Sequence, residues 1–164
     1  MSATPASARA RLAALVAFAI AMGWLEGVVV VYIRGLFGMG HGAPIPPPGE
    51  VVERFGQLPW LLPTEQGREL VTLVMLAAVA WLGAPTARAR IGAFLVIFGI
   101  WDIVYYVALY AMLRWPPSVA TMDVLFLIPP GPWWNQPVWV PVVVSIGMII
   151  AGLRLYGEAK PRRG

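Results

Sequence analysis

Residues 91–113, with the sequence IGAFLVIFGIWDIVYYVALYAML, contain a single charged side chain, that of Asp102. A run of this length and polarity is typical of a helix that crosses a membrane, because the apolar core of a bilayer takes about 20 residues. Three further apolar runs are found in the chain. Hydrocarbon offers the backbone no water to bond, so each run is predicted to be a helix. The four helices are expected at about 12–33, 68–85, 90–113 and 138–155.

The composition of the whole chain agrees with this prediction. Of its 164 residues, 59% are apolar and 12% are charged, and the mean hydropathy is +0.73. Soluble domains are about 45–50% apolar and about 25% charged. The sequence therefore predicts an all-α fold, with one membrane domain over 1–164 that forms a bundle of four transmembrane helices.

The connections between the apolar runs differ in character. The first, 38–63, is rich in Gly and Pro, with Pro44, Pro46, Pro47 and Pro48 close together. Its apolar residues between 51 and 58 recur at helical spacing, which predicts a short helix lying on the membrane. The third connection, 114–137, contains VLFLI at 124–128, which is too apolar for a solvated loop and too short to span. It is predicted either to re-enter the membrane or to pack over the bundle mouth.

The basic residues predict the orientation of the bundle. Eight of the twelve lie on the N-terminus, the second connection and the C-terminus, and four lie on the long first and third connections. The eight are Arg9, Arg11, Arg88, Arg90, Arg154, Lys160, Arg162 and Arg163; the four are Arg34, Arg54, Arg68 and Arg114. Short cytoplasmic segments are enriched in Lys and Arg, so both termini are expected in the cytoplasm and the protein in the inner (cell) membrane.

The first apolar run has a second interpretation. Arg9 and Arg11 precede it and the sequence Ala-Ile-Ala at 19–21 resembles a cleavage site, as in a secretory signal peptide. The run continues to Ile33, which favours an uncleaved helix. Cleavage of residues 1–21 therefore stays open as the alternative.

The acidic residues indicate where a functional site would lie. Glu26 and Asp102 interrupt two apolar runs, Glu65 and Glu69 stand at the outer start of the second helix, and Asp123 lies in the third connection. A charge at the bilayer centre costs roughly 2.5–3.5 kcal/mol, so such groups normally face the bundle interior and have a partner. All five are expected to approach the outer half of one bundle.

Two arginines are candidate counter-charges, and an interior cluster of Glu26, Glu69 and Asp102 with Arg34 or Arg68 is predicted. The complete candidate polar site is Glu26, Arg34, Glu65, Arg68, Glu69, Asp102, Tyr105, Tyr106 and Asp123. Each of these residues also has a structural explanation, such as a helix cap, an ion pair or helix packing, and the choice stays open. Trp24 and Trp101 adjoin the two intramembrane acids, and their indole N–H groups are expected to donate to them. Ser145 is expected to bond to its own helix.

Several chemistries lack the residues they require. The chain has no cysteine, and its only histidine, His41, stands between glycines in a loop. Thiolate or imidazole zinc sites and Ser–His–Asp catalysis are therefore poorly supported. No nucleotide-binding glycine motif is present, and the net charge of +4 lies at helix ends, which does not suggest a nucleic-acid partner. If a metal binds, a hard divalent cation such as Ca or Mg is expected; catalytic residues and enzymatic activity stay undecided.

Four strings together resemble small bacterial four-helix integral membrane proteins for which no activity is known: Trp24-Leu25-Glu26, Glu65-x-x-Arg68-Glu69, Trp101-Asp102-x-x-Tyr105-Tyr106 and 123–129 (DVLFLIP). The resemblance touches all four apolar runs and not the Pro-rich loop. It implies a membrane location and nothing about chemistry.

Three functions remain in competition. The first is an outward-facing carboxylate, tyrosine and arginine cavity that binds a cation, a proton or a polar headgroup. The second is a small accessory or structural subunit of a membrane complex. The third is a small-solute transporter, which would have to be a homo-oligomer because four helices leave little room for alternating access. The expected surroundings are the lipid bilayer, with a second copy or another membrane subunit as the partner.

Overall fold

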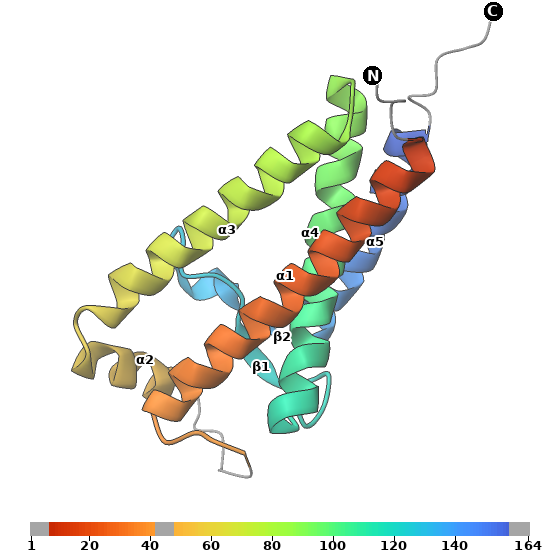
Figure 1. The fold of residues 1–164 in the computed structure, drawn as a ribbon. Helices are drawn as coiled ribbons and strands as arrows, with labels where there is room; N and C mark the ends of the chain where they lie inside the picture. Colours follow the sequence, from red (N-terminus) through yellow and green to blue (C-terminus); the bar gives the residue numbers. More distant parts are fainter. Residues whose placement is uncertain (1–6, 42–47, 158–164) are drawn as a thin grey trace, which may run out of the picture.

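A computed structural model describes residues 7–41 and 48–157 of the chain. Its helices are α1 (Ala8–Leu36), α2 (Pro48–Gln57), α3 (Leu61–Gly83), α4 (Ala87–Leu113) and α5 (Trp139–Gly157), shown in Figure 1. Two short strands, β1 (Met122–Val124) and β2 (Asn135–Pro137), and a 3-10 turn, η1 (Pro132–Trp134), lie between α4 and α5. Residues 42–47 of the Pro-rich loop lie outside the described ranges, and so do three of the basic residues used to predict the orientation, Lys160, Arg162 and Arg163.

Three helices, α1, α4 and α5, are long and apolar enough to cross a membrane. α1 alone, with 29 residues, measures about 44 Å at 1.5 Å per residue. Among the described residues, α3 does not meet that measure, because its first turns carry Glu65, Arg68 and Glu69. The fourth span therefore stays a prediction.

α3 begins earlier than the sequence suggested, at Leu61 instead of near residue 68. Pro63 falls in its first turn, where a helix leaves N–H groups unpaired and proline is tolerated. Glu65 consequently lies in the second turn, inside the helix and buried, and does not cap its start. The short helix expected between residues 51 and 58 is present as α2. Its position on a membrane stays a prediction.

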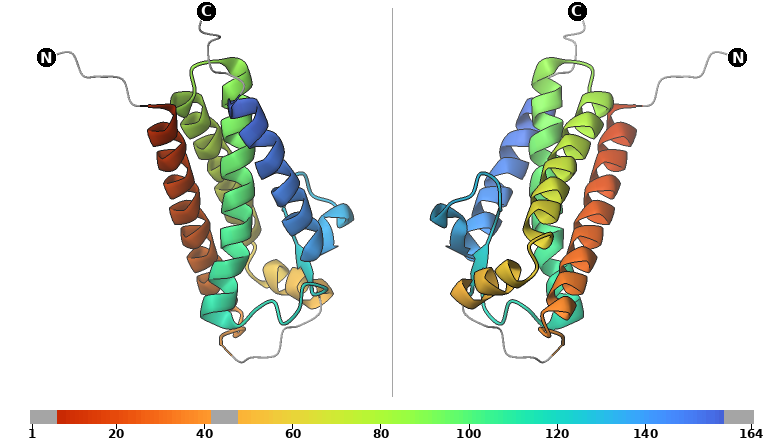
Figure 2. Two further views of the ribbon diagram at one scale, coloured as in Figure 1. Left: turned by 90° about the vertical axis from the view of Figure 1, so that its right-hand side faces the viewer. Right: turned by 90° about the vertical axis from the view of Figure 1, so that its left-hand side faces the viewer.

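α4 stands at the centre of the bundle and packs against α1, α3 and α5 (Figure 2). Glycines allow the closest of these contacts. A Cβ on Gly23 of α1 would lie 2.6 Å from the carbonyl oxygen of Trp101, and one on Gly152 of α5 would lie 2.6 Å from that of Gly92. Small residues of this kind let membrane helices approach backbone to backbone. Gly147, also on α5, does not take part in such a contact and has open space around it.

α1 begins and α5 ends at the same end of the bundle, here called the terminal end, and α2 and the strands lie at the opposite, loop end (Figure 1). Toward the terminal end, α1, α3 and α4 share one apolar core. Its buried members are Leu15, Ala19, Met22, Leu76, Ala80, Ala84, Ala89, Ala93, Ile97 and Trp101. The many alanines let the helices lie close together there. Toward the loop end the three helices line a cavity.

The segment between α4 and α5 folds over this cavity. β1 and β2 pair antiparallel, with Asp123 opposite Gln136, and Leu125 N–H donates to the carbonyl of Trp134 at 3.0 Å. Phe126 stacks near Phe98 of α4, with ring centroids 6.4 Å apart. The apolar stretch at 124–128 therefore contacts the helices. Its depth in a membrane stays a prediction.

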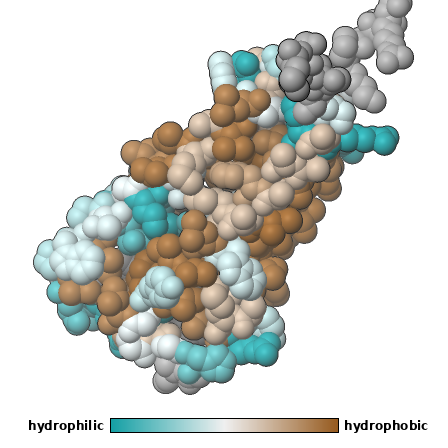
Figure 3. All heavy atoms as spheres, viewed as in Figure 1, coloured by the Kyte–Doolittle hydropathy of each residue, from teal (hydrophilic) through white to brown (hydrophobic). Residues whose placement is uncertain are grey.

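The outer surface of the helices is apolar. Leu82 is 83% exposed, and Leu25, Ile91 and Val143 are each more than half exposed. Figure 3 shows hydrophobic residues across much of the upper part of one face, and hydrophilic residues around the start of α3 and the lower loops. Such a distribution is consistent with a membrane protein whose helices face lipid.

Candidate functional site

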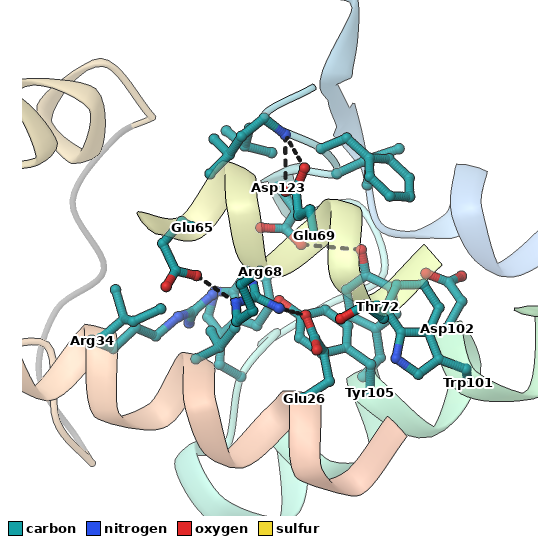
Figure 4. A pocket seen from close by; sticks show the side chains of 18 of the residues that line it. Glu26, Arg34, Glu65, Arg68, Glu69, Thr72, Trp101, Asp102, Tyr105 and Asp123 are labelled. Atoms are coloured by element: carbon teal, nitrogen blue, oxygen red, sulfur yellow. Dashed lines mark hydrogen bonds and ion pairs between the residues drawn. The ribbon is translucent and has the colours of Figure 1, made fainter. Parts of the chain in front are cut away.

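A cavity of about 180 Å³ lies between α1, α3, α4 and residues 122–127. Figure 4 shows its polar side chains converging from these elements. All nine residues of the predicted polar site line it: Glu26, Arg34, Glu65, Arg68, Glu69, Asp102, Tyr105, Tyr106 and Asp123. The structure thus brings together residues that are as far as 97 positions apart in the chain. A functional role for them stays a prediction.

Arg68 makes the principal ion pairs of the cavity. Its guanidinium group binds Glu26 of α1, and its Nε donates to Glu65 at 2.7 Å. Both carboxylates belong to residues that are no more than 6% exposed. Because a buried carboxylate without a partner is costly, one arginine makes the burial of two acids possible. Arg68, and not Arg34, is therefore the counter-charge of Glu26.

The position of Glu26 follows from the helix that carries it. Gly23 and Gly27 flank it and press α1 against α4, where a Cβ on Gly27 would lie 2.7 Å from the Cβ of Ala108. Neighbouring residues of a helix point about 100° apart. Glu26 is thereby directed to the side of this contact, toward α3 and Arg68.

Glu69 binds a backbone group instead of the arginine that the sequence predicted as its partner. It accepts the backbone N–H of Leu127 with both carboxylate oxygens, at 2.9 and 3.0 Å. Gln66, one turn earlier, donates its side-chain amide to the Leu127 carbonyl at 3.1 Å. α3 therefore holds the backbone of residue 127 through both of its polar groups, which fixes the loop segment over the cavity.

Asp102 accepts a hydrogen bond from the hydroxyl of Ser145 at 2.8 Å. The expectation that Ser145 bonds to its own helix is wrong. Gly99, one turn before Asp102, lets α5 approach: a Cβ there would lie 2.6 Å from the carbonyl oxygen of Ser145. The small residue and the acid thus act together, because the close approach brings the hydroxyl within reach of the carboxylate.

Asp123 accepts a hydrogen bond from the hydroxyl of Tyr106 at 3.0 Å. This contact ties β1 to α4. Burial raises the pKa of Asp123 above its usual range, while the positive charge of Arg34 and the hydrogen bonds of Tyr106 and of the Val124 backbone oppose the rise. Asp123 is therefore harder to ionise than an exposed aspartate.

Arg34 lies over the ring of Trp115, with its guanidinium carbon 3.7 Å from the ring centroid. Trp115 is only 2% exposed, so it is packed inside the protein and does not lie on its surface. Its role was missed because a Trp just after a helix end is usually an interfacial residue. A cation–π contact of this kind contributes about 2 kcal/mol of stability when it is shielded from water.

Trp101 and Trp115 are alike in the hydrogen bonding of their indole groups. Both line the cavity, both are buried, and within the described ranges neither indole Nε1–H has a hydrogen-bond partner. Trp101 thus does not donate to a neighbouring acid as expected. Trp24 is 46% exposed and lies outside the cavity lining. Buried donors without acceptors are uncommon, so each calls for an explanation.

A divalent metal held by protein carboxylates is not supported by this geometry. Over residues 7–41 and 48–157, no three acidic, His or Cys side chains are grouped closely enough to hold a metal ion. His41 is exposed and does not line the cavity. Glu26 and Glu65 instead share Arg68, while Glu69, Asp102 and Asp123 each accept from a different donor.

Comparisons of the sequence and of the structure with family models, curated proteins and solved structures find no match.

Proposed function

We propose that this protein is a multi-pass membrane protein that binds a positively charged group in the cavity at its loop end. The observation that carries the proposal is the charge of the cavity wall. Five carboxyl groups and two guanidinium groups line one space of about 180 Å³. A cation that entered it would be stabilised by this excess of acid, and the more so because the surroundings are of low dielectric constant.

The charges do not cancel within the protein. Arg68 offers one positive charge to both Glu26 and Glu65, and Arg34 is the one other basic residue of the cavity lining, against the three further acids Glu69, Asp102 and Asp123. Over the described part of the chain, none of these three acids has a basic side chain within salt-bridge distance. A structural network that served only packing would be expected to satisfy its charges internally. A proton or a cationic ligand would supply the missing charge.

A binding site is favoured over a pathway through the bundle. Between the cavity and the terminal end, α1, α3 and α4 are packed with Leu, Ala, Met and Ile. Beyond Trp101, which lines the cavity, an ion crossing that core would meet no polar side chain of the buried cluster. Transport by one copy of this chain would require that core to open, and no described feature supports this.

The proposed topology has four spans and both termini in the cytoplasm. α1 begins and α5 ends at the same end of the bundle, as an even number of crossings requires. The loop end, with its cavity, would then face outward. Reporter fusions after Ala87 and after Gly164 are expected to read cytoplasmic, and a fusion within residues 129–131 is expected to read external.

The binding proposal is tested by melting the purified protein in detergent with sodium, magnesium, calcium and alkylammonium chlorides. A ligand at 100 times its dissociation constant stabilises the fold by about 2.7 kcal/mol. At least one cation is expected to raise the melting temperature, and Asp102→Asn is expected to reduce that rise. Glu53→Gln, on the exposed part of α2, is the matched control that should leave it unchanged. Absence of any shift with every cation would contradict the proposal.

A further inference from the structure

We infer that the ligand is a small organic ammonium ion with a hydrogen-bond acceptor oxygen next to its charged group, as in a 2-hydroxyethylammonium (ethanolamine) unit. The inference rests on the proposed function and names the ligand class of the same cavity. Its grounds are the distribution of charge, the aromatic lining, an unpaired donor and the cavity size.

The acids that remain uncompensated favour an ammonium ion over a metal cation. Mg²⁺ and Ca²⁺ require six or more oxygen ligands at about 2.0–2.6 Å. Asp102 and Asp123 are instead held apart by different hydroxyl donors, Ser145 and Tyr106, and no metal-binding group of acids occurs within 7–41 and 48–157. An ammonium group needs only one carboxylate at hydrogen-bond distance together with surfaces that tolerate its charge.

The aromatic lining supplies such surfaces. Trp101, Tyr105, Tyr106 and Trp115 all line the cavity, and the faces of aromatic rings attract cations. The protein already holds one cation between a ring and an acid. The guanidinium group of Arg34 lies over the ring of Trp115, and its positive charge interacts with the carboxyl group of Asp123. A ligand ammonium beside Asp102 would be held in the same way by a ring and a carboxylate.

Trp101 indicates that the ligand also carries an oxygen. The residue is 7% exposed, it lines the cavity, and within the described chain its Nε1–H has no acceptor. In Figure 4 the indole nitrogen lies on the edge of the ring that is turned toward Glu26 and Tyr105. An orphaned buried N–H costs about 1–3 kcal/mol, and an oxygen of the ligand would recover part of it. Asp102 lines the same cavity, so one ligand that extends across it can contact both side chains.

The size of the cavity sets the size of the ligand. An apolar cavity of about 150 Å³ holds benzene. A cavity of about 180 Å³ therefore accommodates a molecule of that order, and an ethanolamine unit fits with room for its substituent. The unit can come from free ethanolamine or from the headgroup of phosphatidylethanolamine. Both present the same ammonium and the same adjacent oxygen.

The test compares ethanolamine with ethylamine, which has the ammonium and lacks the oxygen, by calorimetric titration of the purified full chain in a detergent without amino groups. Ethanolamine is expected to bind more tightly, by about 2- to 10-fold for one neutral hydrogen bond. Asp102→Asn is expected to weaken both by about 10- to 100-fold, since it removes the charged partner. Trp101→Phe is expected to abolish the preference for ethanolamine. That preference is a ratio within one variant, so it does not depend on the stability of the variant.

The source of the unit is decided in nanodiscs. Retention of phosphatidylethanolamine over phosphatidylcholine in native mass spectra, lost in Asp102→Asn and kept in Glu53→Gln, identifies the lipid headgroup. Binding of free ethanolamine without this retention identifies a soluble amine. Binding of Mg²⁺ or Ca²⁺ through Asp102 with no response to either amine would overturn the inference and leave the proposed function standing. Failure of metals and amines alike would overturn both.

Discussion

Arg68 of α3 and Glu26 of α1, which are 42 residues apart in the chain, form an ion pair across the cavity. The same guanidinium group binds Glu65, one turn away on its own helix. One side chain thus links two helices and supplies the positive charge that two buried acids share. The fold and the charge of the cavity depend on the same contact.

Replacing Arg68 by leucine should destabilise the protein strongly. The variant leaves Glu26 and Glu65 buried without a counter-charge, and breaking a buried pair typically costs about 3–5 kcal/mol. Restoring neutrality with Glu26→Gln and Glu65→Gln in the same chain should recover most of that loss. Denaturant or thermal unfolding in detergent measures both effects.

The control for this series is the partly exposed pair of Arg54 and Glu50 on α2, whose side chains are 29% and 44% exposed. Exposed ion pairs contribute about 0–1 kcal/mol, so Glu50→Gln should change stability little. An Arg68→Leu protein as stable as the Glu50→Gln protein would show that the cavity pair is not formed.

Gly23 should be intolerant of any side chain. Gly23→Ala places a methyl group 2.6 Å from the Trp101 carbonyl, which forces α1 away from α4, and overpacking of this kind costs about 1–3 kcal/mol. Gly35→Ala, on the same helix with open space around it, should not destabilise the fold and provides the matched control. Equal melting temperatures for the two variants would argue against the close packing of α1 on α4.

Much of the architecture could be predicted from the sequence. Length, polarity and spacing predicted the apolar helices near their observed bounds, and the expense of burying charge predicted that the polar residues would converge. The nine residues named in advance do line one cavity. This works because a few acids in long apolar runs have few alternatives to a shared interior.

The pairing within the cavity could not be predicted. Arg34 and Arg68 were equivalent candidates, and the choice depends on helix rotation, which Gly23 and Gly27 set through a contact with α4. The Ser145 hydroxyl reaches Asp102 only because Gly99 admits α5 closely. Such contacts join distant parts of the chain, so no local pattern reveals them.

Ser145→Ala and Asp102→Asn should have opposite consequences. The first variant removes the hydroxyl that donates to Asp102 and should cost about 1–3 kcal/mol of stability. The second keeps an acceptor for that hydroxyl and removes the charge, so stability should be preserved or raised while cation binding is lost. Melting and titration of the same samples measure both. A destabilised Asp102→Asn protein that still binds would favour a structural role for the acid.

Asp123 should make the stability of the ligand-free protein depend on pH. Burial raises the pKa of this residue above the ordinary value of about 3.9, so the folded state binds its proton more tightly than the unfolded state does. The unfolding free energy should therefore rise as pH falls through the folded pKa toward the unfolded value. Cation affinity should fall over the same range, because protonation removes the charge.

Asp123 does not stand alone, because Arg34, Tyr105, Tyr106 and Asp102 all interact with it electrostatically. The informative quantity is consequently the difference between the unmodified protein and Asp123→Asn, measured by unfolding at pH 4 to 8. A difference that does not change with pH would mean that Asp123 keeps its ordinary pKa.

The most direct test of an acidic cavity that faces outward uses the absence of cysteine from the chain. Val30→Cys places one thiol on the cavity lining, and Leu25→Cys places one on the exposed apolar face of the same helix. In intact cells, an externally added trimethylammonium-ethyl methanethiosulfonate should modify position 30 faster than the sulfonate reagent does, after correction for their rates with a free thiol. Asp102→Asn should reduce this preference, and position 25 should stay unmodified. Equal corrected rates at position 30, or modification only after the cells are opened, would contradict the account.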